Sequence, residues 1–216
     1  MGKCNCRRPP VLRVKGTGVT EMDSNAALNE LRDAILAAYP GYTATQLVTS
    51  VWLVNSLSAI QQDQDLLGET RDTPYLRTED FALTNNEFIV VYGLNHVRSG
   101  KATYANVNVY GNTPVEGGTG EKELAGVASI NSVQDFAGTA SDYIPGHARV
   151  DDFYAYRIAW NNPAEDPHCL VIPPPAGRLK LQILFLAFRI YIEPGRAIGT
   201  ASEELLFDRA ILFRPK

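Results

Sequence analysis

The side chains of this chain best suited to acid–base or metal chemistry are its three histidines. His96 follows a compact apolar run, His147 lies in the segment IPGHARVDD, and His168 lies in the proline-flanked segment NNPAEDPHC. All three are expected in loops or at strand ends, where the fold could bring them together with a carboxylate. The carboxylates that we consider as partners are Asp151, Asp152 and Asp166.

Such a site would have a defined chemistry. Two or three imidazoles with one carboxylate suit zinc, iron or manganese, and would predict a small metal-dependent β-barrel enzyme. The sequence lacks the His-x-His and His-Glu-x-x-His spacings that place two ligands on one strand or one helical face. Histidines that only face solvent are therefore the alternative, and we expect no resident metal and no cofactor.

The three cysteines, Cys4, Cys6 and Cys169, allow two further kinds of site. On an extended chain Cys4 and Cys6 point to the same side, and with His168 and Cys169 they could complete a tetrahedral zinc site. Cys169 could instead act as a nucleophile with one of the other histidines as its base. Against this, cysteine in an apolar run such as CLVI is usually a small buried hydrophobic residue.

The N-terminal residues and the cysteine count bear on the cellular location of the protein. Gly2, the nearby cysteines and the pair Arg7-Arg8 resemble a doubly acylated membrane anchor, but Cys6 stands where that motif has Ser or Thr. An odd number of cysteines fits a reducing compartment. The opening residues lack the apolar stretch of a signal peptide, so either the chain is cytoplasmic or its signal was removed. No apolar run is long enough to cross a bilayer.

Tyrosine is a frequent polar aromatic residue, with ten copies, and several of them fall in or beside expected strands. Tyrosines can line a cleft and orient a small ligand or a carbohydrate through their hydroxyl groups. They also simply suit the half-buried surface of a sheet. The candidate binding residues are therefore His96, His147, His168, Tyr104, Tyr154 and Tyr156.

Composition excludes several partners. With 216 residues and 45% hydrophobic content the chain can form a genuine core, and its formal charge of -4 argues against nucleic acid, which needs clustered Lys and Arg. The segment from Gly93 to Lys101 begins like a phosphate-binding loop. The spacing from Gly93 to Gly100 is too long, Ala102 replaces the metal-binding hydroxyl, and no helix follows. We therefore expect no nucleotide there.

Helical patterns are confined to the N-terminal part. Leu28, Leu31 and Ile35 recur at helical spacing within a helix expected over 24–38. Residues 43–60 form a second apolar run, whose length favours another helix, although its Val and Thr content leaves a strand open.

Short strands separated by turn residues dominate from residue 73 onward. Residues 88–92 and 102–110 are expected to pair as a wide β-hairpin. Other strands are expected at 125–130, 153–160, 179–192 and 210–213. Arg189 interrupts the apolar middle of the third of these, so it should emerge at an edge or meet an acid such as Glu193 or Asp208.

These patterns predict an α+β chain, mainly antiparallel β, in which a short helical N-terminal segment packs on a β-sandwich or barrel. Within one domain, residues 1–20 are an N-terminal arm, 21–66 the helical segment and 73–216 the sandwich or barrel. We expect a non-catalytic binding or assembly module that recognises a small ligand or a protein partner through strand-end loops. The arm has few apolar residues, so we expect it to pack on a neighbouring subunit of a homo-oligomer.

Overall fold

The N-terminal part of the described chain forms a short helical segment. The computed structural model describes residues 15–52, 71–114, 122–172 and 183–216. η1 (Met22–Ser24) leads into α1 (Asn25–Ala38), which buries Leu28, Leu31 and Ile35 on one face. The expected amphipathic helix is therefore confirmed.

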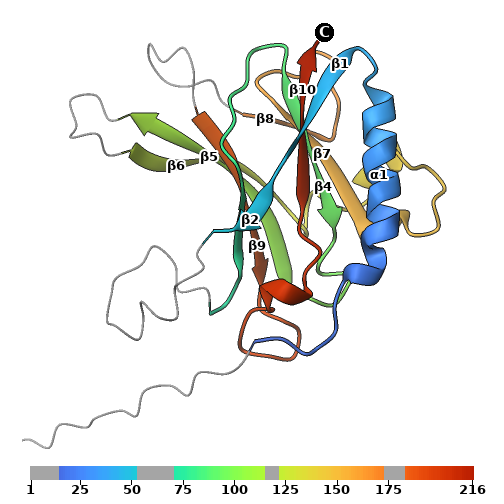
Figure 1. Ribbon diagram of the computed structural model, residues 1–216, viewed down its shortest axis with the longest axis vertical. Coiled ribbons are helices and arrows are strands. Elements are labelled where there is room, and N and C mark those ends of the chain that lie inside the picture. The colour runs from blue at the N-terminus through green and yellow to red at the C-terminus, as the bar shows by residue number, and fades with distance from the viewer. Residues whose placement is uncertain (1–14, 53–70, 115–121, 173–182) are drawn as a thin grey trace, which may run out of the picture.

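The described strands form two sheets (Figure 1). The first, called the β1 sheet, has the order β1 (Tyr42–Leu47), β10 (Arg209–Pro215), β4 (Phe88–Leu94), β7 (Phe153–Ala159) and β8 (Cys169–Val171). The second, called the β2 sheet, has the order β2 (Thr49–Val51), β3 (Tyr75–Thr78), β9 (Ile183–Tyr191), β5 (Tyr104–Pro114) and β6 (Lys122–Asn131). Neighbouring strands are antiparallel except β7 and β8.

The strand pairs are nested along the chain. β5 pairs with β6, β4 with β7, β3 with β9, and β1 with β10, as though one long hairpin had been rolled up. Two further pairs, β10 with β4 and β9 with β5, join these strands into the two sheets. This is the topology of a jelly roll, a sandwich of eight strands in two Greek keys, to which β2 and β8 are added.

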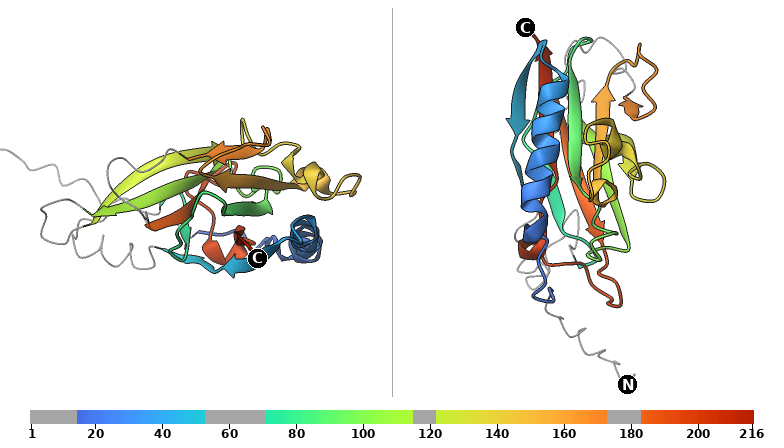
Figure 2. Two further views of the ribbon diagram at one scale, coloured as in Figure 1. Left: turned by 90° about the horizontal axis from the view of Figure 1, so that it is seen from above. Right: turned by 90° about the vertical axis from the view of Figure 1, so that its right-hand side faces the viewer.

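Two apolar cores hold the layers together. Between the sheets pack Val107 and Val109 of β5 with Leu184 and Leu186 of β9, none more than 1% exposed. A second core joins the outer face of the β1 sheet to the buried face of α1, which runs along the strands of that sheet (Figure 2). The β1 sheet is thus covered on both faces. The fold class is confirmed as a sandwich, and the described strands close no barrel.

The prediction of a second helix over residues 43–60 is wrong for the residues that the structure describes. Residues 43–51 lie in β1 and β2, which follow each other directly across Val48, while 53–60 lies outside the described residues. The apolar run is long because two strands adjoin, and its many Val and Thr residues favour strands over helix.

The expected hairpin is also wrong. Both of its arms are strands, but β4 belongs to the β1 sheet and β5 to the β2 sheet, so the segment 95–103 crosses from one sheet to the other. The β5 alternation itself is confirmed, since Ala105, Val107 and Val109 are buried while the residues between them are half-buried.

The remaining expected strands are confirmed as β6, β7, β10 and, in its described part, the central strand β9. Arg189 of β9 meets neither of the expected acids. Its guanidinium instead donates to the hydroxyl groups of Tyr110 at 2.6 Å and Tyr191 at 3.3 Å. None of the helices in the described ranges has the length and apolar character that a bilayer crossing requires.

Candidate functional site

A buried group of charges lies where β4 ends and the crossing segment 95–103 begins. The side chain of His96 is 1% exposed. Its Nδ1 lies 2.9 Å from Glu21 Oε1 and its Nε2 lies 3.2 Å from Asp208 Oδ2. The hydroxyl of Tyr154 donates to Asp208 Oδ1 at 2.6 Å. Four segments that are distant in sequence therefore meet around one imidazole.

The neighbouring carboxylates keep His96 protonated. Burial alone would lower the pKa of His96, but the charges of Asp208 and Glu21 outweigh burial and raise it to about 10. Burial would raise the pKa of Glu21, yet His96 and the hydrogen bonds from Ser99 and the Leu206 N–H lower it below its usual value. At neutral pH an imidazolium therefore lies between two carboxylates.

Lys101 makes a second buried ionic group next to the first. Its Nζ lies 2.6 Å from Glu204 Oε2 and 3.2 Å from Glu193 Oε1. The backbone N–H of Thr17 donates to Glu204 Oε1 at 2.7 Å, and Arg196 contacts Glu193 Oε2 at 3.1 Å. These contacts fasten the chain before η1 to Glu204 of η4 (Ser202–Glu204) and to the segment before η4.

These two groups are poorly placed for catalysis. A general acid or base has to reach a proton on a substrate, but the side chains of His96, Lys101 and their carboxylate partners are at most 10% exposed. Every carboxylate among them already accepts from a fixed donor. Buried charges that are paired and hydrogen-bonded in this way tie segments of a fold together.

The three histidines do not converge. His147 Nε2 lies 3.3 Å from Glu30 Oε2 on α1, and His168 Nδ1 lies 2.6 Å from Asp142 Oδ2 at the end of η2 (Thr139–Asp142). His96 is buried with acids of its own. Each imidazole thus has a separate carboxylate partner, and the described residues form no metal site of three imidazoles.

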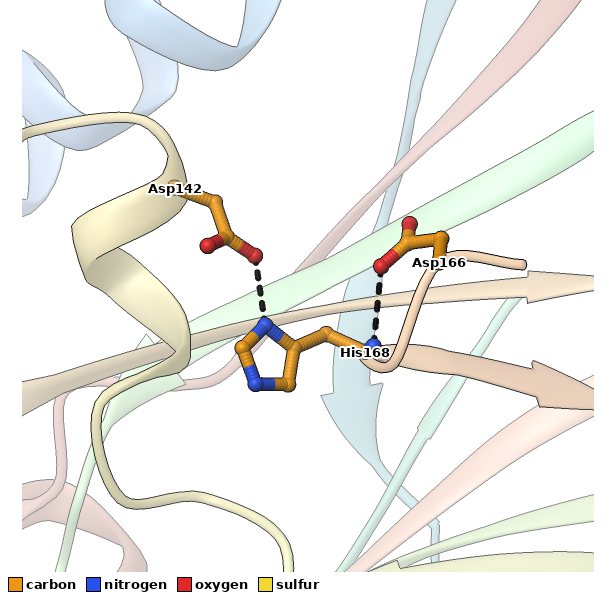
Figure 3. A group of neighbouring side chains, drawn as sticks. All are labelled: Asp142, Asp166 and His168. Carbon is orange, nitrogen blue, oxygen red and sulfur yellow. Dashed lines mark hydrogen bonds and ion pairs between the residues drawn. The ribbon is translucent and has the colours of Figure 1, made fainter. Parts of the chain in front are cut away.

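One surface cluster does bring potential metal ligands together. Asp142, Asp166 and His168 each place one ligand atom within 4.8 Å of the others, and the described residues contain no second group of this kind. Figure 3 shows the imidazole of His168 facing Asp142, with Asp166 on the loop beside it. Of the acids considered from the sequence, Asp166 therefore belongs to such a cluster, whereas Asp151 and Asp152 do not.

The three candidate tyrosines lie in different surroundings. Tyr154 is fully buried and Tyr156 is 9% exposed, and both belong to the core between the sheets. Tyr104 is half-buried and packs its ring 5.7 Å from that of Tyr191. Tyr104 precedes Ala105, which faces the core, so it lies on the outer face of the β2 sheet. These tyrosines do not line one cleft.

The cysteine sites gain no support. Cys169 is half-buried in β8, and burial raises the pKa of its thiol. A raised pKa reduces the thiolate, which is the nucleophilic form. Cys4 and Cys6, with the lipid-anchor motif at Gly2, lie outside the described residues.

An open pocket of about 470 Å³ lies between η1, the β1–β2 segment and the residues around η4. Its lining includes Met22, Gln46, Phe207 and Arg209, and also Asp208, so it adjoins the buried charges. The six candidate binding residues are absent from its lining.

Comparisons with protein-family models, curated proteins and solved structures return no match. Among the residues brought together by the fold, sequence reasoning missed Glu21, Lys101, Glu204 and Asp142. One indication in the sequence pointed to Lys101, because this charged residue lies a few residues before β5, a strand with one apolar face. Asp142 had none, because 26 residues separate it from its partner His168.

Proposed function

We propose that the protein is a non-catalytic assembly module that associates with further copies of the same chain through the free edge of β1. β1 pairs with β10 on one side and has no partner on the other among the described strands. Four consecutive residues, Thr43 to Gln46, are exposed. This open edge is the observation that carries the proposal.

The β1 edge lacks the features that usually prevent strands from pairing, which are charge, proline, a bulge or short length. Residues 42–51, YTATQLVTSV, contain no charged residue, no proline and no glycine. Their Thr, Val and Tyr residues favour strands. The edges β2 and β8 have three residues each, and β6 begins with Lys122 and Glu123. β1 is therefore the least protected edge of the described sheets.

A two-fold axis beside β1 would pair this edge with the same edge of a second copy. Two antiparallel β1 strands would join the β1 sheets of two copies into one continuous sheet, with the same surface contributed by each copy. Thr43 and Thr45 would then come close to the same residues of the second copy. Threonine pairs across neighbouring strands are stabilising.

The jelly-roll topology is compatible with this role. Jelly rolls serve as subunits of virus shells, as lectin domains and as cupins. A ligand site inside the sandwich would need a cavity with convergent polar groups, whereas apolar side chains fill the space between these two sheets. Because fold alone does not determine function, the proposal of a shell-type, self-associating subunit depends on the β1 edge.

Light scattering of the full-length protein tests the proposal. We expect an oligomer at micromolar concentration, and a lower molar mass for the double variant Ala44→Lys/Thr45→Lys, because like charges facing each other across a strand pair are unfavourable. The matched control is Val133→Lys, which adds charge at a residue that is 75% exposed and follows β6, an edge strand of the other sheet. A monomeric wild type, or an unchanged mass in the double variant, would refute the proposal.

A further inference from the structure

We infer that Asp142, Asp166 and His168 form a binding site for a divalent metal ion, for which Zn²⁺ is the best match. Zinc accepts imidazole nitrogen together with carboxylate oxygen, whereas Mg²⁺ and Ca²⁺ prefer oxygen ligands alone. The site lies between η2 and the loop before β8, so it does not depend on association through β1.

The ligand atoms are close enough to share one ion. They lie within 4.8 Å of one another, and the ligands of a zinc ion, each about 2 Å from the metal, are roughly 3–3.5 Å apart. His168 Nδ1 is already 2.6 Å from Asp142 Oδ2, so the ion would replace the proton between them. A closer approach of the Asp166 carboxylate to the other two ligand atoms would complete the set.

Both sides of the site are held by the fold. On the loop, the Asp166 N–H donates to Asn162 Oδ1 at 3.0 Å, and Asn162 Nδ2 donates to the Asp166 carbonyl at 2.8 Å. The His168 N–H donates to Asp166 Oδ1 at 2.8 Å. On the other side, Thr139 of η2 accepts a hydrogen bond at 3.1 Å from the backbone of β7. Little ordering of the chain is therefore left for the metal to provide.

The surroundings are rich in negative charge. Asp142 Oδ2 lies 2.6 Å from His168 Nδ1, and Asp166 Oδ1 lies 2.8 Å from the backbone nitrogen of the same residue. Two carboxylates beside one imidazole leave an excess of negative charge that a divalent cation would neutralise.

An ion can reach this site from solvent. The side chain of His168 is 30% exposed and that of Asp142 is 44% exposed. Three protein ligands leave room in the coordination sphere of zinc for water. In this respect the cluster differs from His96 and its two acids, whose side chains are at most 3% exposed.

Calorimetric titration of the metal-free full-length protein with Zn²⁺ alone tests the inference. We expect one equivalent to bind per chain, and His168→Ala or Asp142→Asn to weaken binding by roughly tenfold or more. His147→Ala is the matched control, because it removes an imidazole that has a single carboxylate partner, Glu30. It should bind zinc like the wild type.

Two further measurements make the result decisive. A Cys4→Ser/Cys6→Ser variant and a Cys169→Ser variant should keep the affinity, which separates this site from thiolate ligation. Thermal melting without zinc should show that each variant is folded, and Asp166→Asn replaces any variant that is not. The inference fails if the wild type does not bind below millimolar Zn²⁺, if His168→Ala binds equally well, or if the cysteine variants abolish binding.

Discussion

The surroundings of His96 and the strand β1 differ in how completely their polar groups are paired. Around His96, ionisable side chains are concentrated, yet each is buried against an oppositely charged partner. β1 has no charged side chain, yet one side of its backbone has no partner among the described strands. In this chain most of the buried ionisable side chains hold the fold together, whereas the uncharged strand β1 keeps an unpaired edge among the described strands.

The largest expected effect comes from removing one of the buried carboxylates beside His96. Asp208→Ala removes one of the two carboxylates that hold His96 and takes the acceptor from Tyr154. Breaking a buried ion pair costs roughly 3–5 kcal/mol in the free energy of unfolding. Glu30→Ala, which removes the exposed partner of His147, should cost about 1 kcal/mol at most. Urea denaturation of both variants measures the difference, and equal costs would remove the contrast.

A smaller effect is expected at Gly93 of β4. A Cβ at this position would overlap Asp208 Oδ1 and press on the ring of Tyr154. Extra atoms in a packed interior cost about 1–3 kcal/mol, so Gly93→Ala should lower the melting temperature. At Gly41 nothing lies within 4 Å of the added Cβ, and Gly41→Ala should melt like the wild type. Similar melting of both variants would mean that Asp208 is not held tightly against β4.

The pH dependence of stability should be the most gradual effect. His96 has a pKa of about 10 when folded, against 6.5 ordinarily, so the folded state holds this proton more tightly. Its contribution is complete below pH 6.5 and is lost as the pH rises through 10. The free energy of unfolding should fall by roughly 1 kcal/mol per pH unit in this range. In His96→Gln the slope should be flatter, and an identical slope would assign the effect to other groups.

Glu21 should produce the opposite trend in acid. Its pKa is lowered below the ordinary 4.5, so its contribution is present above that value and is lost as the pH falls through the folded pKa. Glu21→Gln should therefore reduce the acid dependence of the free energy of unfolding, measured by urea denaturation between about pH 5 and pH 3.

Local patterns in the sequence predicted much of the fold. The spacing of Leu28, Leu31 and Ile35 located α1, and apolar runs located β4, β7 and β10. Pairing was harder to predict, because β4 and β5 are adjacent in sequence but lie in different sheets. Sequence adjacency favours a hairpin, whereas the observed partners are set by the rolling of the whole chain. The length of the apolar run 43–60 favoured a helix, whereas two adjoining strands, β1 and β2, account for its described part.

The site residues were less predictable, because their interactions depend on partners that are distant in sequence. His96 is buried only because Glu21 and Asp208 arrive from the two ends of the described chain. His168 gains Asp142 through the packing of η2 against the loop before β8. No spacing within a motif links these residues, so their types could be noticed from the sequence but their grouping could not.

Hydrogen exchange in β1 tests self-association through this edge most directly. Alternate N–H groups of β1 point away from β10, so they exchange in a single subunit and become protected when another strand pairs with them. We predict that protection over 42–47 rises with protein concentration, while the edge strand β6 does not change. β1 amides that exchange equally fast at all concentrations would contradict association through this edge.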